Sequence, residues 1–386
     1  MFKRWLKING QKSCLIIGPR RCGKTTLLKQ GYPTLPYATL DDLDLLQWAK
    51  TDPKGFVASL GKVAIIDEIQ RLPSLTVAVK YAIDNEGARF FMTGSSNLGL
   101  MDAAADTLAG RIEIFSLPTA CWGENEGWPD HSILHENVGL PKIKEANRRL
   151  KNAMQFGQFP EVVNHENDQK KKELLVNYKN TYFTRDLMQL SNIENLDGLM
   201  AVFQHLIRSV GSHLEVSNFA TEAGISHPTA RKYLNALSQS QMTFKLYGYQ
   251  YGPAKRYIKA AKTYFADNGI LHSFNVNLNE GQLMENFVIS ELEKRRKLGF
   301  IKADQFYYYK SSAGNEIDLI FETDNAVYAI EVKAAKIPTS KHLRSLRQFK
   351  DRLNRPIKRI LFYAGEEYGA VDDIRLLPIG SLFQGQ

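Results

Sequence analysis

Cysteine is scarce in this sequence: Cys14, Cys22 and Cys121 are the only three among 386 residues. Three cysteines are too few for a disulfide framework, and these lack the paired spacing of zinc ligands. Their scarcity suits a reducing compartment. Long apolar runs are also lacking, and none follows the charged residues near Met1, so neither a signal peptide nor a transmembrane helix is predicted. We therefore expect a cytoplasmic protein with no membrane partner.

Acidic residues are outnumbered by basic ones. Lysine and arginine total 50 against 41 aspartates and glutamates, which gives a formal net charge of +9. This balance favours anionic partners such as nucleotides or DNA, and a solvated basic surface is the plain alternative. The hydrophobic share of 44% and the charged share of 24% are ordinary for a globular protein. The length is sufficient for two or three domains.

Four short apolar runs separated by helical patterns dominate the N-terminal third of the chain. This alternation predicts an α/β fold with a parallel sheet and helices on both of its faces. Each run ends in polar residues, and open α/β sheets bind ligands at the carboxyl ends of their strands. The runs span residues 13–18, 63–66, 90–92 and 112–117.

A glycine-containing loop lies between the first run and a helix-forming stretch. Residues 18–25 read Gly-Pro-Arg-Arg-Cys-Gly-Lys-Thr, which matches the Walker A pattern G-x-x-x-x-G-K-S/T. Glycine lets the backbone curl so that its N–H groups surround phosphate oxygens, and the helix that follows presents its positive N-terminus. Lys24 would reach the β- and γ-phosphates of ATP, and the Thr25 hydroxyl would ligate Mg²⁺. The alternative is a glycine turn with an incidental lysine. The predicted nucleotide contacts in this loop and helix are Gly18, Pro19, Arg20, Arg21, Cys22, Gly23, Lys24, Thr25 and Thr26.

Two adjacent carboxylates, Asp67 and Glu68, follow the second apolar run. A carboxylate at the end of a buried strand can hold Mg²⁺, usually through water. A second carboxylate beside it can polarise the attacking water. We therefore predict Asp67 as a magnesium ligand and Glu68 as the catalytic residue of ATP hydrolysis, with two exposed turn carboxylates as the alternative.

Two more residues near strand ends are candidates. Ser95, in the Thr-Gly-Ser-Ser-Asn segment after the third run, could sense the γ-phosphate, or it could belong to a simple turn. Arg111 precedes the fourth run. It is either an arginine finger that acts on the ATP of a neighbouring subunit or a surface arginine in an ion pair. A finger would require a homo-oligomer.

The middle of the chain is predicted to be helical. Residues 216–223, a turn at 224–226 and residues 227–237 follow the helix-turn-helix pattern, and the β-prone segment 242–251 comes next, as a wing would. His227 and Arg231 on the second helix could face DNA phosphates. Packing of protein against protein is the alternative.

With these residues in view, the chain resembles AAA-type ATPases of bacteria and archaea that carry a C-terminal domain of unknown function. The resemblance spans about residues 10–365 and favours the arginine-finger interpretation of Arg111. It implies an ATPase followed by a winged helix and a nuclease-like domain. One departure is Gln158, where the family often has glycine. The matching segments are 18–25, 65–70, 91–96, 108–111, 157–161, 182–187 and 262–269.

Four polar residues of the C-terminal part follow the order of a PD-(D/E)xK nuclease core. Glu285 lies on a predicted helix, Asp318 on a strand, and Glu331 and Lys333 share one face of the next strand. A hairpin would bring Asp318 and Glu331 together. The two acids could then bind Mg²⁺ or Mn²⁺, while the lysine stabilises developing charge. An inactive nuclease-like scaffold is the alternative.

These patterns predict four parts. They are a P-loop ATPase core (residues 1–120), a helical lid or linker (121–195), a winged-helix-like region (196–275) and a restriction-endonuclease-like α/β domain (276–386). Three functions fit: Mg-dependent ATP hydrolysis that moves the C-terminal half, a nucleotide-switched DNA-binding module with little turnover, or an ATP-regulated, metal-dependent DNA nuclease. DNA-stimulated hydrolysis and metal-dependent nicking would discriminate among them.

Overall fold

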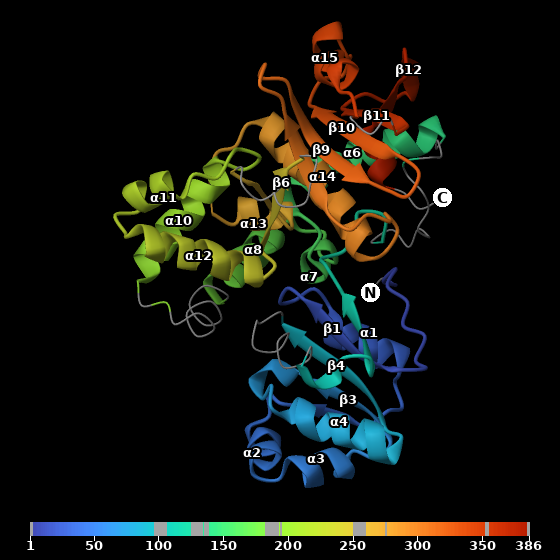
Figure 1. Ribbon diagram of the computed structural model, residues 1–386, viewed down its shortest axis with the longest axis vertical. Coiled ribbons are helices and arrows are strands. Elements are labelled where there is room, and N and C mark those ends of the chain that lie inside the picture. The colour runs from blue at the N-terminus through green and yellow to red at the C-terminus, as the bar shows by residue number, and fades with distance from the viewer. Residues whose placement is uncertain are drawn as a thin grey trace. The chain divides into compact units, whose positions relative to one another are not determined.

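The computed structural model describes two compact units, each taken by itself here (Figure 1). The N-terminal unit comprises Leu6–Thr119 with Gln239–Gln241, and the C-terminal unit comprises the other described residues. Among the described helices, none is long and apolar enough to cross a bilayer. The described residues are 3–95, 106–124, 134, 139–181, 193, 195–249, 260–274, 276–351 and 355–383.

The N-terminal unit contains a five-stranded parallel sheet in the order β2-β3-β4-β1-β5. Its strands are β1 (Ser13–Gly18), β2 (Tyr37–Thr39), β3 (Val63–Asp67), β4 (Arg89–Ser95) and β5 (Ile112–Ser116). The four predicted strands and their parallel pairing are confirmed. The sequence did not indicate β2, because three residues are too short to show a hydrophobic pattern.

Both faces of this sheet are covered, because successive side chains of a strand point to opposite faces. Cys14 and Ile16 pack on the side of α1, in a cluster that includes Leu28 of that helix. Leu15 packs on the opposite side with residues of α2, α3 and α4, among them Phe56. The helices are α1 (Lys24–Gly31), α2 (Leu43–Thr51), α3 (Pro53–Ser59) and α4 (Leu75–Glu86), and the short 3₁₀ helix η1 spans Ile69–Arg71.

The C-terminal unit contains a mixed eight-stranded sheet in the order β12-β13-β11-β10-β9-β8-β6-β7. Its strands are β6 (Thr243–Gly248), β7 (Lys262–Phe265), β8 (Phe306–Lys310), β9 (Glu316–Glu322), β10 (Val327–Lys333), β11 (Ile357–Tyr363), β12 (Gly369–Val371) and β13 (Ile374–Pro378). Its helices are α6 (Leu140–Phe156), α7 (Pro160–Val163), α8 (Asp168–Thr181), α10 (Leu196–Arg208), α11 (Val216–Glu222), α12 (His227–Gln239), α13 (Asn268–His272), α14 (Glu280–Lys297) and α15 (Ser340–Gln348), with the 3₁₀ helix η5 at Ile379–Phe383.

The predicted helix, turn and helix of the middle region are present as α11 and α12. Gly224 in the turn has a φ of 59°, a left-handed conformation that glycine adopts without strain. The segment predicted as a wing is also a strand, but β6 pairs with β7 on one side and with β8 on the other. It is therefore part of the large sheet, which extends across the predicted boundary at residues 275 and 276.

A buried charged network holds α14 in the C-terminal unit. The Glu291 carboxylate, fully buried, accepts hydrogen bonds from Lys294 Nζ at 2.9 Å, Arg295 Nη1 at 2.7 Å and the Trp122 backbone N–H at 2.9 Å. Arg295 also donates to the carbonyl oxygen of Leu382 at 2.7 Å. Because these cations lie away from water, they depend on Glu291 for compensation.

We predict that Glu291→Ala will destabilise the protein by about 3–5 kcal/mol, because it removes the acid that the two buried cations share. Chemical denaturation followed by circular dichroism measures the change. Glu145→Ala is the matched control, since Glu145 and Arg149 form the same i,i+4 pair on an exposed helix face. It should cost only about 0.3–0.5 kcal/mol. Equal effects of the two variants would contradict the assigned role of the network.

Candidate functional site

The loop between β1 and α1 (residues 18–25, here named the curl) has the tightly turned backbone that a phosphate site requires. Gly23 (φ 95°) and Arg21 (φ 60°) are left-handed, and a side chain at Gly18 would lie 2.1 Å from the Leu117 carbonyl oxygen. Gly23 is the N-cap of α1 and provides no side-chain hydrogen bond to the first turn. The N–H groups at that end of α1 are therefore available to an anion.

Lys24 is buried and folds back over the same loop. Its Nζ donates to the carbonyl oxygens of Gly18 at 3.0 Å and Pro19 at 3.1 Å. The loop carbonyls thus hold the ammonium group beside the curl. An anion in the curl would meet this charge without movement of the backbone.

Asp67, at the end of β3, accepts hydrogen bonds from several side chains of the site. Thr25 Oγ1 donates to both carboxylate oxygens, at 2.9 and 3.0 Å, and Tyr37 from β2 donates to Oδ2 at 2.7 Å. Thr93 of β4 also hydrogen-bonds to Asp67. The structure therefore brings the predicted pair Thr25 and Asp67 into direct contact. It adds Tyr37, which sequence reasoning missed, and Thr93, which lay in the predicted sensor segment but was given no role at Asp67.

Glu68 has an unusual backbone conformation for a residue with a side chain. Its φ of 58° and ψ of 41° are left-handed, a conformation that costs roughly 1–2 kcal/mol. Its carboxylate hydrogen-bonds to the Gln70 amide, and the Gln70 Oε1 accepts from the Ser95 backbone N–H at 3.2 Å. Gln70 therefore links the predicted catalytic residue to the predicted sensor. Gln70 lay inside the motif at 65–70, but the motif gave it no role.

These residues fit Mg-ATP on structural grounds. The first turn of α1 offers N–H groups and Lys24 an ammonium for phosphate oxygens, and Thr25 with Asp67 offers the oxygen ligands that Mg²⁺ prefers. Arg111 lies elsewhere in the unit and pairs with Asp84 at 2.7 Å, an exposed ion pair. Ser96 and Asn97 lie outside the described residues.

A second polar cluster lies in the C-terminal unit, where the structure brings Asp318, Glu331 and Lys333 together. Asp318 Oδ2 accepts from the Val332 backbone N–H at 2.9 Å, and Lys333 Nζ lies 3.6 Å from Asp318 and 2.9 Å from Glu331. Burial and the charge of Asp318 raise the pKa of Glu331. Burial opposes ionisation of Asp318 as well, but the charge of Lys333, the hydrogen bond with Glu331 and the charge of Lys262 together outweigh it and lower that pKa. Of the two carboxyl groups, Asp318 is therefore the stronger acid.

Glu285 joins the same cluster from α14. It accepts from Tyr264 Oη at 2.7 Å, and burial, with the nearby Asp318, raises its pKa to about 7. The loop before α11 packs over it, since a side chain at Gly211 would lie 2.7 Å from Glu285 Oε1. All four predicted nuclease residues thus meet in one place.

The cluster also includes cations that sequence reasoning missed. Lys262 on β7 is 3% exposed and pairs with Glu316, which also pairs with Lys310 at 3.4 Å. Lys262 begins the motif at 262–269, so a signal for it was present without an assigned role. In the described part of the chain, no three His, Cys, Asp or Glu side chains are arranged to hold a metal ion.

Two other segments of the resemblance meet in the C-terminal unit. The Gln158 backbone N–H donates to Asp267 Oδ1 at 3.1 Å, and a side chain at Gly157 would lie 1.7 Å from the same oxygen. Lys294 pairs with Asp267 at 3.3 Å. These segments therefore support the fold. The segment 182–187 lies outside the described residues.

Comparison with protein families bears on the nucleotide site. A family model described as an AAA domain matches residues 10–125, which include the curl, Asp67 and Glu68. These residues are therefore similar to a P-loop domain of the AAA type. Models described as domains of unknown function match residues 147–281 (DUF8612) and 280–382 (DUF4143). The P-loop domain is thus followed by two regions whose families carry no assigned activity.

The similarity to relatives in other organisms covers most of this chain. An uncharacterized protein of Mycobacterium tuberculosis, Rv2008c, is 25% identical over 344 residues, which is 86% of this chain and 72% of the relative. An uncharacterized protein of Methanocaldococcus jannaschii, MJ1544, is 25% identical over 339 residues, 83% of this chain and 74% of the relative. Among solved structures, the Walker-type ATPase PABY2304 of Pyrococcus abyssi matches with a TM-score of 0.43 and 12% identity, over 69% of this chain and 92% of that one.

Proposed function

We propose that the protein binds Mg-ATP at the P-loop and hydrolyses it. The observation that carries the proposal is the contact of Thr25 with Asp67, beside the curl that holds Lys24. In a P-loop enzyme this threonine and this acid are the groups that hold the magnesium ion. Here they come from α1 and β3 and are already in place.

Each residue of the site then has a chemical task. Bound Mg-ATP supplies a γ-phosphate that water can attack. Lys24 would exchange its bonds to the two loop carbonyls for bonds to phosphate oxygens, while Thr25 and Asp67 hold the metal. Glu68 would orient the attacking water and accept its proton. Ser95, linked to Glu68 through Gln70, would sense the γ-phosphate.

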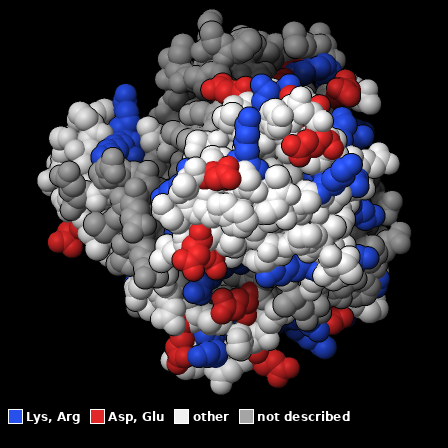
Figure 2. Space-filling view, turned by 90° about the horizontal axis from the view of Figure 1, so that it is seen from below, with Lys and Arg blue, Asp and Glu red and all other residues white. Residues whose placement is uncertain are grey.

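Further parts of the proposal concern what hydrolysis drives. We infer that ATP turnover moves the C-terminal unit and that DNA is a candidate partner. We also infer that the protein is a homo-oligomer. In it, Arg111 would leave Asp84 and act as an arginine finger on the ATP of a neighbouring subunit. A nucleotide-switched DNA-binding module with little turnover is the competing function. Basic and acidic side chains of the described residues are interspersed on the face drawn in Figure 2, so these residues form no basic stripe there that would favour DNA binding. DNA stimulation of ATPase activity separates the two.

We predict that Lys24→Ala will lower kcat/KM for ATP by about 100- to 1,000-fold, because it removes the cation at the phosphates.

Glu68→Gln should leave ATP affinity intact and lower kcat by about 100- to 10,000-fold, because only the proton acceptor is lost. Steady-state phosphate release, with and without DNA, measures both. Wild-type turnover that neither variant changes would rule out this site as the ATPase centre.

We also predict a positioning role for Gln70. Gln70→Ala should lower kcat by about 10- to 100-fold with little change in KM, since it frees the Glu68 carboxylate without touching the phosphates. Gln70→Asn should restore part of the rate, whereas Gln47→Ala on the exposed face of α2 is the control. Loss of ATP affinity in parallel with kcat would instead indicate a structural role for Gln70.

A second function, metal-dependent DNA cleavage, is favoured by one observation: the convergence of Glu285, Asp318, Glu331 and Lys333. Lys262 and Lys333 neutralise these acids, so a divalent metal would have to displace an ammonium group. We expect nicking of supercoiled DNA with Mn²⁺ by the wild type and at least about 100-fold less by Asp318→Asn. Asp324→Asn, in the turn between β9 and β10, is the control. Cleavage that persists in Asp318→Asn would contradict this second function.

A further inference from the structure

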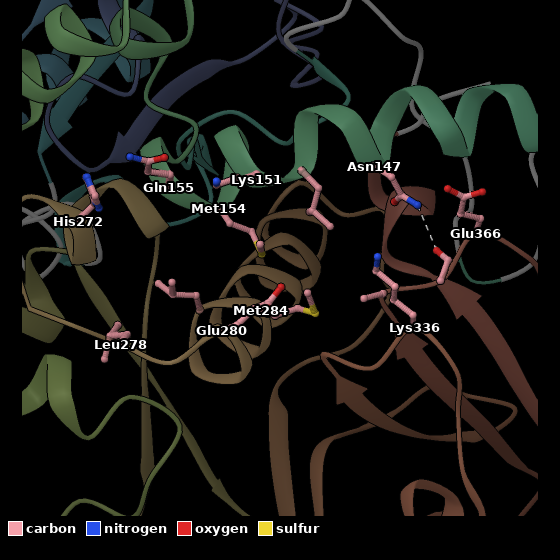
Figure 3. Close-up of a pocket in the computed structure, with 14 residues that line it drawn as sticks. Asn147, Lys151, Met154, Gln155, His272, Leu278, Glu280, Met284, Lys336 and Glu366 are labelled. Carbon is pink, nitrogen blue, oxygen red and sulfur yellow. Dashed lines mark hydrogen bonds between the residues drawn. The ribbon is translucent and has the colours of Figure 1, made fainter.

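A cavity of about 920 Å³ lies in the C-terminal unit (Figure 3). Its lining includes none of the clustered residues Glu285, Asp318, Glu331 and Lys333. One wall is a stripe of α6, where the lining residues recur at helical spacing. The opposite wall is the first turn of α14, beside His272 of α13. The residues lining these walls are Asn147, Leu150, Lys151, Met154, Gln155, His272, Leu278, Glu280, Leu283 and Met284.

The remaining wall lies at the carboxyl edge of the sheet. β10 and β11 are parallel neighbours, and the segments that follow them contribute Lys336 and the stretch Ala364–Glu366. The Ala364 N–H donates to the Ala335 carbonyl oxygen at 3.0 Å, which joins the two segments. Open α/β sheets bind ligands at this edge.

The walls are held in place by close contacts. Asn147 Nδ2 donates to the Gly365 carbonyl oxygen at 3.3 Å and so ties α6 to the end of β11. A side chain at Gly365 would lie 2.1 Å from the Tyr363 ring and 2.9 Å from the Lys336 carbonyl oxygen. Only glycine allows these segments to approach so closely. The cavity is therefore a built feature of the fold.

The lining combines an apolar floor with polar ends, and Glu280 lies between the ends, beside Met284 (Figure 3). Leu150, Met154 and Met284 are buried, and the two methionines offer flexible, polarisable surface. Figure 3 shows Gln155 and His272 toward one end and Lys336 and Glu366 toward the other. The floor suits an apolar ring or short chain, and the two ends differ in charge.

The charged side chains at the two ends, Lys151, Lys336 and Glu366, are exposed to solvent. Neither Lys151 nor Lys336 has a hydrogen bond or ion pair to another described side chain, and the same holds for Glu366. The Lys336 end contains Glu366, whereas the His272 end combines Lys151 with an amide and an imidazole. Burial and the nearby Lys172 lower the pKa of His272, so its ring is neutral at pH 7 and can donate or accept. That end is suited to an anionic group.

We propose that this cavity binds a small amphipathic anion, a molecule with an apolar ring or short-chain body and one carboxylate, sulfonate or phosphate group. Its body would lie on Met154 and Met284, and its anionic group would meet Lys151, Gln155 and His272. A mostly apolar pocket with a few polar groups at one end is the usual form of a small-molecule site. None of its lining residues belongs to the nucleotide site or to the cluster of Glu285, Asp318, Glu331 and Lys333.

A fluorescence titration of the full chain with anilinonaphthalene sulfonate tests the proposal. The wild type should bind the probe at one saturable site, and phenylnaphthylamine, which has a similar body without the sulfonate, should bind more weakly. Lys151→Glu should weaken sulfonate binding at least about 10-fold. Lys144→Glu makes the same charge change on α6 outside the cavity and should leave binding unchanged.

A second variant tests the cavity itself. Gln155→Trp fills space from the rim, where Gln155 is only half-buried, and should weaken both probes while circular dichroism and the unfolding temperature stay unchanged. Two results would overturn the proposal: no saturable binding by the wild type, or equal affinities of Lys151→Glu and Lys144→Glu for the sulfonate.

Discussion

The contact between Asp67 and the Thr25 hydroxyl is the constraint on which the nucleotide site depends. It joins the end of β3 to the first turn of α1 and brings the curl and the carboxylates to one edge of the sheet. Tyr37 and Thr93 donate to the same carboxylate from the two strands beside β3. Side chains from α1, β2 and β4 therefore hold the carboxylate of Asp67, at the end of β3, in one position. If Mg²⁺ binds here as proposed, these bonds preorganise the carboxylate for it.

The strained backbone at Glu68 has a consequence for function. A left-handed glutamate persists only where the surroundings hold it, and here the Gln70 amide and the Thr93 hydroxyl, which accepts from the Glu68 N–H at 3.2 Å, do so. The strain turns the carboxylate toward Gln70 and thereby toward Ser95. Gln70 thus links the proposed catalytic residue Glu68 to the proposed sensor Ser95 at the end of β4.

The sequence predicted the parts of this site that depend on local pattern. The phosphate loop, the four apolar strands and the carboxylate pair all follow from residue types at fixed spacing. Tyr37 could not be predicted, because its role comes from strand pairing between β2 and β3. The role of Lys262 could not be predicted for the same reason, because Lys262 and Glu316 come together only in the folded sheet. The hairpin that brings Asp318 to Glu331 was predictable because both acids lie on adjacent strands. The strand predicted as a wing became part of the large sheet, a pairing that no local pattern encodes.

The central claim is that the curl, Lys24, Thr25 and Asp67 form one magnesium-dependent site for a nucleoside triphosphate. Calorimetric titration of the purified full chain with ATP, once with Mg²⁺ and once with EDTA, tests it most directly. The account predicts one site per chain whose affinity is at least about 10-fold higher with Mg²⁺ than without. An affinity that is independent of the metal, or the absence of saturable binding in both buffers, would contradict it.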